Sequence, residues 1–245
     1  MALDTEGQGS VAPRGNDPMV GSGYLTKPSI LGRVRSSDPN KPLIEWGENL
    51  QRDGPDLEGR VNSWFCDLHM GDQVFLSSHD QLTRLGWKED FRIDPGDFAL
   101  LLSEERVSIP PDLAAFISLR FGVALKGLIN ISGRHVDPGF SGKLVFSVYN
   151  AGSNPVVMRR GDPVFMITFA HLDGAAPSKV GTHFQDIDSL RSDWIERAMG
   201  PPVSLVRLSR EVESLNLRFK VYFGILGAAA SVIAVTFLAW VLTAK

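Results

Sequence analysis

The sequence has almost no cysteine: Cys66 is the only one in 245 residues. A single thiol excludes an internal disulfide framework and a cysteine-rich metal site, and it is typical of a protein in a reducing compartment. The five histidines show no paired ligand spacing, so the His-x-Glu and cysteine-pair signature of a zinc deaminase is absent as well. Ligand spacing alone therefore predicts no resident metal.

An excess of basic residues is also lacking. The 25 Lys and Arg residues against 28 Asp and Glu residues give a formal net charge of −3, without the basic surplus expected of a nucleic-acid binder. The charge is unevenly distributed, because residues 203–245 carry +3 and residues 1–202 carry −6. The sequence predicts an acidic head, a basic tail and no nucleic-acid partner.

The start of the chain lacks the basic and then apolar pattern of a secretory signal. It is rich in Gly, Ser and Pro, which predicts a flexible leader. The composition shifts that follow divide the chain into five expected segments. They are a leader at 1–27, a β domain at 28–173, a linker with a short helix at 174–202, a coiled-coil stalk at 203–220 and a transmembrane helix at 221–244.

Charged residues are absent from residues 221–244. A helix of that length rises about 36 Å and can cross a hydrocarbon core of roughly 30 Å. The run therefore predicts a transmembrane helix in contact with the lipid bilayer, with a buried core helix as the alternative. Because Lys245 follows the run and Arg218 and Lys220 precede it, we expect a tail-anchored, single-pass topology with the head in the cytoplasm.

A second apolar pattern precedes the span. Its residues follow steps of three and four, as in the seam of a left-handed coiled coil. They are Leu205, Leu208, Val212, Leu215 and Phe219. The spacing predicts a self-associating stalk or, since two heptads are too short to be stable alone, a single amphipathic helix that lies on the membrane or on the head.

Short alternating or apolar runs, separated by turn residues, occupy the head and predict an all-β domain. Helical periodicity returns only at residues 186–199, where apolar side chains share one face. The expected strands lie near residues 73–76, 98–102, 115–120, 127–131, 143–149, 155–158 and 163–169.

Five motifs of the head resemble, in order, those of the superfamily of dCTP deaminases and trimeric dUTPases. They lie at residues 66–71, 93–100, 104–113, 133–142 and 148–152. The resemblance covers residues 28–172. It implies a mainly β head of the dUTPase-like β-clip, or distorted jelly-roll, type, which forms a homotrimer, builds each site from neighbouring subunits and binds a nucleotide ligand.

The string Asp137-Pro138-Gly139-Phe140 carries the catalytic part of the resemblance. In the dUTPase version, the aspartate, here Asp137, orients or deprotonates the attacking water and reads the deoxyribose hydroxyl. The aromatic residue, here Phe140, stacks against the sugar. From the residues alone, Asp, Pro and Gly are also what a hairpin turn requires, so a plain turn is the alternative.

Residues 120–126 resemble the phosphate motif of the dUTPases, with Arg120, Gly122 and Lys126 as nucleotide contacts. The alternative is that both cations are solvated or lie at a subunit interface. The string departs from the family at Phe121, where dUTPases carry serine, and at Leu125, where deaminases carry arginine. A phenyl ring cannot donate a hydrogen bond to a phosphate, so this half of the site is expected to be degenerate.

Ser147 occupies the position of the glutamate that serves the deaminases as general acid and base. A serine hydroxyl cannot shuttle a proton from water to the leaving ammonia as a carboxylate can, and Glu104 and Glu105 lie elsewhere in the pattern. The sequence thus predicts a membrane-anchored nucleotide-binding protein whose deaminase or diphosphatase site is degenerate. The alternative is an inactive trimeric sensor or scaffold head that signals to or organises a membrane. Mg²⁺ is expected only if the protein cleaves phosphates.

Overall fold

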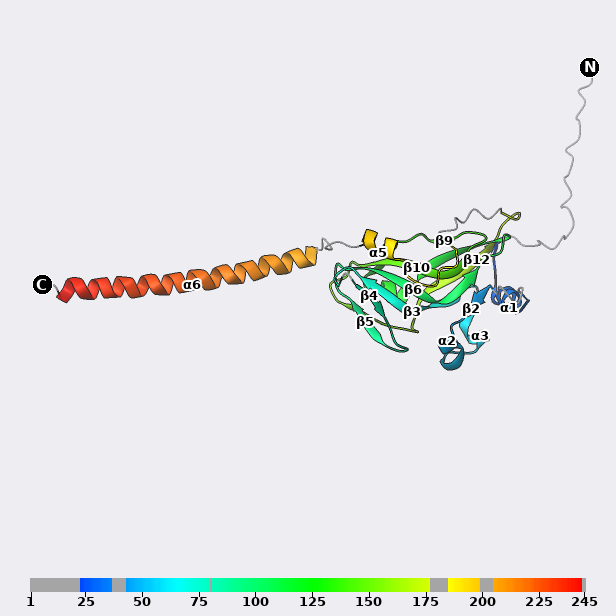
Figure 1. The fold of residues 1–245 in the computed structure, drawn as a ribbon, viewed down its shortest axis with the longest axis horizontal. Coiled ribbons are helices and arrows are strands. Elements are labelled where there is room, and N and C mark those ends of the chain that lie inside the picture. The colour runs from blue at the N-terminus through cyan, green and yellow to red at the C-terminus, as the bar shows by residue number, and fades with distance from the viewer. Residues whose placement is uncertain (1–22, 37–42, 80, 177–184, 199–204, 244–245) are drawn as a thin grey trace, which may run out of the picture.

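The computed structural model describes residues 23–36, 43–79, 81–176, 185–198 and 205–243. It contains a β domain and one long C-terminal helix that runs away from that domain (Figure 1). The expectation of a mainly β head followed by a helix is confirmed. Most of the expected leader lies outside the described residues.

An antiparallel sheet of ten strands, curled on itself, forms the domain, with seven strands in the order β8-β10-β6-β3-β12-β7-β9. The path consists of β3 (Cys66–Leu76), β6 (Phe98–Ser108), β7 (Leu113–Leu119), β8 (Leu128–Asn130), β9 (His135–Val136), β10 (Ser141–Asn150) and β12 (Pro163–His171). Beside it, β1 (Gly23–Tyr24) pairs with β12, β2 (Ile44–Glu45) with β6 and β4 (Gln81–Arg84) with β3. A separate two-stranded sheet pairs β5 (Asp90–Ile93) with β11 (Val156–Arg159).

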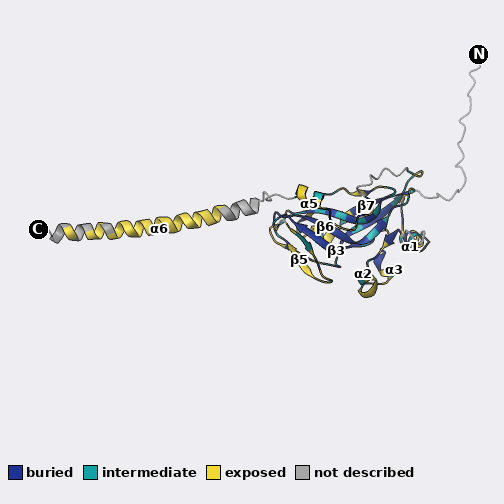
Figure 2. Ribbon diagram, in the orientation of Figure 1, coloured by how far each residue is buried: buried dark blue, intermediate teal, exposed yellow. Residues whose placement is uncertain are grey.

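Strand β10 has the two-residue period that positions the site. Leu144, Phe146 and Val148 are buried, whereas the residues between them are half-buried. The ring of Phe146 stacks on Phe165 of β12, with centroids 3.6 Å apart and planes 12° apart. Because alternate side chains point to opposite faces, Ser147 lies on the face opposite this core contact. Figure 2 shows the buried residues gathered along the central strands.

All seven segments expected to be strands contain one, but β3 and β6 are longer than their apolar runs suggested. Three helices precede β3, namely α1 (Lys27–Ser36), α2 (Glu48–Asp53) and α3 (Leu57–Arg60), and α4 (Phe121–Ala124) follows β7. Helix α1 is a departure from the expectation of strands alone. Pro28 in its first turn is compatible with a helix start, and Ile30 and Leu31 are buried.

The helix expected at residues 186–199 is shorter than its periodicity suggested: α5 spans Ser192–Ala198, and residue 199 lies outside the described residues. The cause is a pairing with the sheet. Ile187 forms a parallel bridge with Gly142 of β10, and the amide of Lys143 donates to the carbonyl of Ile187 over 2.7 Å. This pairing keeps the chain extended before α5 and brings the helix against the β domain.

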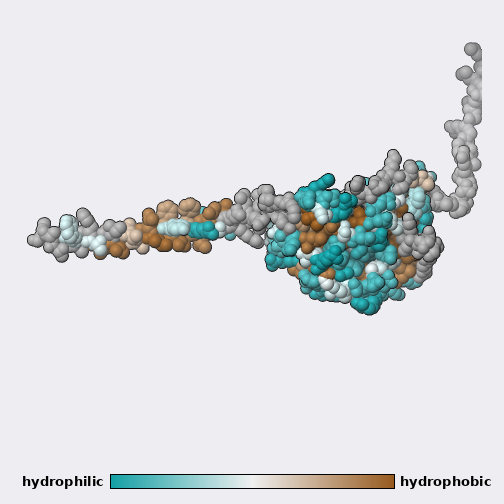
Figure 3. All heavy atoms as spheres, in the orientation of Figure 1, coloured by the Kyte–Doolittle hydropathy of each residue, from teal (hydrophilic) through white to brown (hydrophobic). Residues whose placement is uncertain are grey.

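Helix α6 (Leu205–Thr243) is continuous through the expected stalk and span. Its residues Val212–Thr236 form one stretch long and apolar enough to cross a membrane, with a mean hydropathy of 1.7. None of that stretch is buried (Figure 2), so the helix does not pack as a core helix of the described domain. Figure 3 shows its apolar surface beside the mostly hydrophilic surface of the domain.

Candidate functional site

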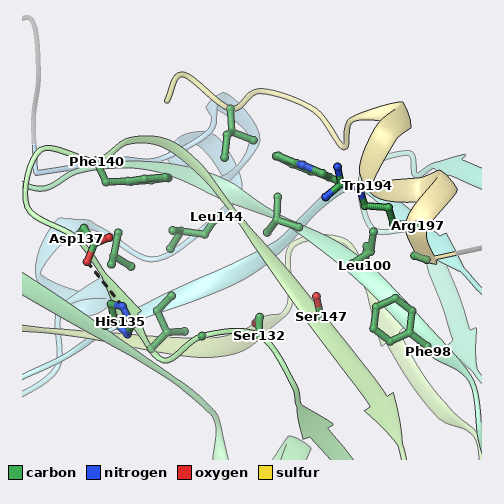
Figure 4. Close-up of a pocket in the computed structure, with 16 residues that line it drawn as sticks. Phe98, Leu100, Ser132, His135, Asp137, Phe140, Leu144, Ser147, Trp194 and Arg197 are labelled. Carbon is green, nitrogen blue, oxygen red and sulfur yellow. Dashed lines mark ion pairs between the residues drawn. The ribbon is translucent and has the colours of Figure 1, made fainter. Parts of the chain in front are cut away.

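A pocket of about 750 Å³ lies between the sheet and α5 (Figure 4). Its walls come from β6, β7, β10, from β9 with the segments on either side of it, and from the region of helix α5. Three residues singled out in the sequence meet there: Asp137, Phe140 and Ser147. The fold thus brings these three residues to one pocket.

The turn at residues 137–140 positions one end of the pocket. The amide of Phe140 donates to the Asp137 carbonyl over 3.1 Å, and the amide of Gly139 donates to the Ile109 carbonyl over 2.7 Å. Gly139 has a φ of 83°, in the left-handed region that favours glycine. The residues thus form a tight turn, and the same turn presents the Asp137 carboxylate to the pocket.

The side chains at this end are an acid and an imidazole beside an aromatic wall. His135 Nε2 lies 3.7 Å from Asp137 Oδ1, and both side chains are exposed. Phe140 is only 9% exposed. A carboxylate at the mouth of a pocket with a buried aromatic side chain can accept hydrogen bonds from hydroxyl groups while the ring excludes water.

Ser147 lines the pocket from β10, and Asp137 is the only carboxylate among the described lining residues. The two glutamates on the neighbouring strand β6 are not in the pocket. They are buried and engaged elsewhere: Glu104 accepts from Arg160 over 3.1 and 3.2 Å, and Glu105 lies 2.5 Å from His69 Nδ1. The structure thus offers no second carboxylate near Ser147 within the described chain.

Two polar or aromatic residues of α5 also line the pocket, and no sequence motif assigns either of them to a site. Trp194 and Arg197 line the end of the pocket far from Asp137, both from α5 (Figure 4). The periodicity of residues 186–199 placed Trp194 on an apolar helix face but did not show what that face covers. The parallel bridge between Gly142 and Ile187 brings α5 against the sheet, and this contact determines that the helix face covers the pocket.

The predicted phosphate segment does not line this pocket. Phe121 and Leu125 are 75% and 70% exposed, and nothing lies within 4 Å of a Cβ placed on Gly122. Arg120 Nη1 lies 2.5 Å from Asp67 Oδ1, and Lys126 is exposed. Within one chain the segment is a solvent-facing, partly apolar surface, apart from the ion pair of Arg120.

The described residues contain no group of three or more His, Cys, Asp or Glu side chains that could hold a metal ion. Asp137 and His135 alone would supply two side-chain ligands. Mg²⁺ is usually held by one or two carboxylates together with substrate phosphates, so the described residues of one chain would leave most of its ligands to a bound phosphate or water.

A family model described as dCTP deaminase-like matches residues 25–172. The dUMP-forming dCTP deaminase of Hydrogenobaculum sp. is 27% identical over 179 residues, which cover 67% of this chain and 98% of that protein. The dCTP deaminase of Pyrococcus furiosus is 32% identical over 119 residues, 49% of this chain and 74% of that protein.

Among solved structures, the dCTP deaminase of Agrobacterium tumefaciens superposes with a TM-score of 0.49 at 15% identity. The match covers 61% of this chain and 49% of that one, so the chain spans about half the length of this solved relative. The family match, by contrast, takes in more than half of the present chain and all of the strands that line the pocket, whereas α5 lies outside it. The chain belongs to the dCTP deaminase-like family.

Proposed function

We propose that the β domain binds a deoxynucleotide in the pocket and deaminates dCTP slowly or not at all. In this proposal the sugar lies at the Asp137 end, against Phe140. The observation that carries the proposal is that Asp137 and Phe140 share one pocket with Ser147, which stands where the resemblance places the glutamate of the deaminases.

The Asp137 end suits recognition of a sugar. The carboxylate can accept from a sugar hydroxyl or orient a water molecule. The Phe140 ring gives the sugar an apolar wall and leaves little room for an extra hydroxyl on that side. Diphosphate cleavage, in which a water oriented by Asp137 attacks a phosphorus atom, thus remains compatible with this end of the pocket.

Deamination makes a further demand at the other end. Water must add to the ring carbon that bears the amino group, and a proton must pass from that water to the departing ammonia. Ser147 presents a hydroxyl where a carboxylate would carry the proton, and Glu104 and Glu105 are occupied by Arg160 and His69. The rate of deamination should therefore be low.

The proposal extends to assembly and location. We infer a trimeric head whose neighbouring copies cover the apolar side chains that one chain leaves exposed on and after α4, namely Phe121, Leu125, Ile129 and Ile131. We also infer that the charge-free part of α6 after Lys220 anchors the head in a bilayer, with Arg218 and Lys220 on the cytoplasmic side.

The test uses the full chain in detergent, incubated separately with dCTP and dUTP. Calorimetry should detect binding, and chromatography should show little or no dUTP or dUMP formed from dCTP. Asp137→Asn should weaken binding, because an amide is a poorer acceptor than a carboxylate. Rapid formation of dUTP or dUMP from dCTP would refute the weak-deaminase proposal, and absence of binding would refute the nucleotide proposal.

A second candidate is an inactive head whose role is assembly at a membrane. It is favoured by the exposed apolar side chains of α6, such as Leu215 and Phe219, which are 50% and 60% exposed in a single chain. If these side chains form a seam between copies, the paired substitution Leu215→Glu and Phe219→Glu should lower the mass of the detergent-solubilised assembly in light scattering. An unchanged mass would remove this argument.

A further inference from the structure

The pocket is polar at both ends and apolar in between. Asp137 and His135 lie at one end, and Trp194 and Arg197 lie at the other, with Leu144 between them (Figure 4). The two ends therefore differ in sign: one presents a carboxylate that accepts hydrogen bonds, and the other presents a guanidinium that only donates them.

Arg120 and Arg160 are held by Asp67 and Glu104, respectively. Within the described part of the chain, no ion pair or hydrogen bond engages the Arg197 side chain. It stands in the last turn of α5 and lines the pocket. Its five N–H donors are thus available to a molecule bound there.

Trp194 gives the same end of the pocket a flat wall. Its ring lies under the guanidinium of Arg191, whose central carbon is 5.3 Å from the ring centroid. A tryptophan in a pocket wall is a surface on which a nucleotide base can stack. An aromatic wall beside a donor suits a flat ring with a hydrogen-bond acceptor on its edge.

The two ends of the pocket suggest which way round a nucleotide would bind. This step rests on the proposed function. If the sugar lies at Asp137, the base extends toward Ser147, Trp194 and Arg197. Uracil and cytosine differ at one edge: uracil has a carbonyl oxygen beside an N3–H donor, and cytosine has an amino group beside an unprotonated N3 acceptor. The serine hydroxyl can serve either ring. A guanidinium that faces the carbonyl position can donate to uracil, whereas an amino group at that position would leave donors on both sides unpaired.

We propose that Arg197, with Trp194 beside it, is a specificity-determining residue that makes the pocket prefer a uracil-type base over a cytosine-type base. The preference comes from a charge-assisted hydrogen bond to the ring carbonyl. It also explains the serine at position 147, because a pocket that selects the keto ring does not need a group that removes an amino group.

The test measures the binding of two probes, the α,β-imido analogues of dUTP and dCTP, to the full chain in detergent by calorimetry, with chromatography of the recovered probe to show that its base is unchanged. The two probes carry the same sugar and phosphates, so their affinity ratio reports on the ring alone. The wild-type protein should bind the uracil probe at least about tenfold more tightly. Arg197→Gln should bring the ratio close to one by weakening only the uracil probe.

Two further variants keep the result interpretable. Arg197→Lys retains a cationic donor and should keep part of the preference. Arg84→Gln removes the same charge from an exposed arginine of β4 that does not line the pocket, and it should leave the ratio unchanged.

Three results would overturn the proposal. Equal affinities in the wild-type protein would show that the pocket does not read this edge. An equal loss for both probes in Arg197→Gln would show that Arg197 binds phosphate instead. If neither probe binds the wild-type protein, the proposed nucleotide function itself fails and this inference fails with it, a result distinct from binding without preference.

Discussion

The turn at residues 137–140 and the segment at residues 120–126 both resemble motifs of the family, yet they differ in their surroundings in the fold. The first faces a pocket built within one chain and contains an aromatic side chain, Phe140, that is 9% exposed. The second contains an aromatic side chain, Phe121, that is 75% exposed. The first region thus lies in a pocket that also contains Ser147, whereas the second forms an outward-facing surface of the single chain.

The largest expected difference between the two regions concerns packing. Phe146→Ala on β10 should lower the free energy of unfolding by about 3–5 kcal/mol, because it removes a fully packed ring and leaves a cavity. Phe121→Ala should change it by less than about 0.5 kcal/mol in a single chain, because that ring is exposed. Urea denaturation followed by tryptophan fluorescence measures both. Phe121→Ala should cost more in the trimeric head proposed above than in a single chain, because neighbouring copies would then cover that ring.

Two glycines, Gly142 next to the pocket and Gly122 in α4, should respond differently to substitution by alanine. Gly142 has a φ of 144°, and a Cβ there would lie 2.7 Å from the amide nitrogen of Ile187. Gly142→Ala should therefore cost about 1–3 kcal/mol, and it should loosen α5 at the pocket. Hydrogen exchange would then speed up across Ser192–Ala198.

The matched control is Gly122→Ala in α4, where a Cβ meets nothing within 4 Å. Alanine favours the helix, so this change should be neutral or stabilising by up to about 1 kcal/mol. Unchanged protection of α5 in Gly142→Ala would contradict the role given to the bridge between Gly142 and Ile187.

The smallest expected effect concerns Asp112, a carboxylate outside the pocket that contributes to stability, in contrast to Asp137 in the pocket. Arg33 Nη2 lies 2.5 Å from Asp112 Oδ2, and the hydrogen bond from Arg33 lowers the pKa of Asp112. A lowered folded-state pKa stabilises the fold above the unfolded value, near pH 3.9, and this stabilisation is lost as the pH falls through the folded value. Since the Asp112 side chain is 41% exposed, the contribution should be below about 1 kcal/mol.

Arg33→Gln should therefore lower stability slightly at pH 7 and not at all once Asp112 is protonated in both proteins. Urea denaturation over a range of pH measures this difference. Nucleotide affinity should be the same in Arg33→Gln as in the wild-type protein. A loss of affinity would mean that the two carboxylates are not independent.

Strands with a regular period could be predicted from the sequence, and those that bury charge could not. The alternation along β10 and the glycine and proline turns around it are local signals. The second half of β6 lacked such a signal, because Glu104 and Glu105 are buried in it. Their partners are remote: Arg160 lies 56 positions from Glu104, and His69 lies 36 positions from Glu105. A local pattern cannot show that a buried charge will be paired.

The pocket residues also divide into those that a local sequence pattern could indicate and those that depend on a remote contact. Asp137 and Phe140 belong to one continuous motif and Ser147 directly precedes another, so the sequence could single out three residues that line one pocket. Trp194 and Arg197 reach the pocket only because the preceding residues pair with β10, which is about fifty positions earlier in the chain. Helical periodicity can mark an apolar face, but the tertiary contact decides what that face covers.

The most direct test of the account compares two substitutions by calorimetry on the full chain with the α,β-imido analogue of dUTP. Asp137→Asn, at the turn, should weaken binding by about tenfold or more. Lys126→Gln, in the outward-facing segment, should weaken it by less than about threefold. If Lys126→Gln abolishes binding and Asp137→Asn leaves it intact, the nucleotide is held by the outward-facing segment, and the pocket around Asp137 is not the binding site.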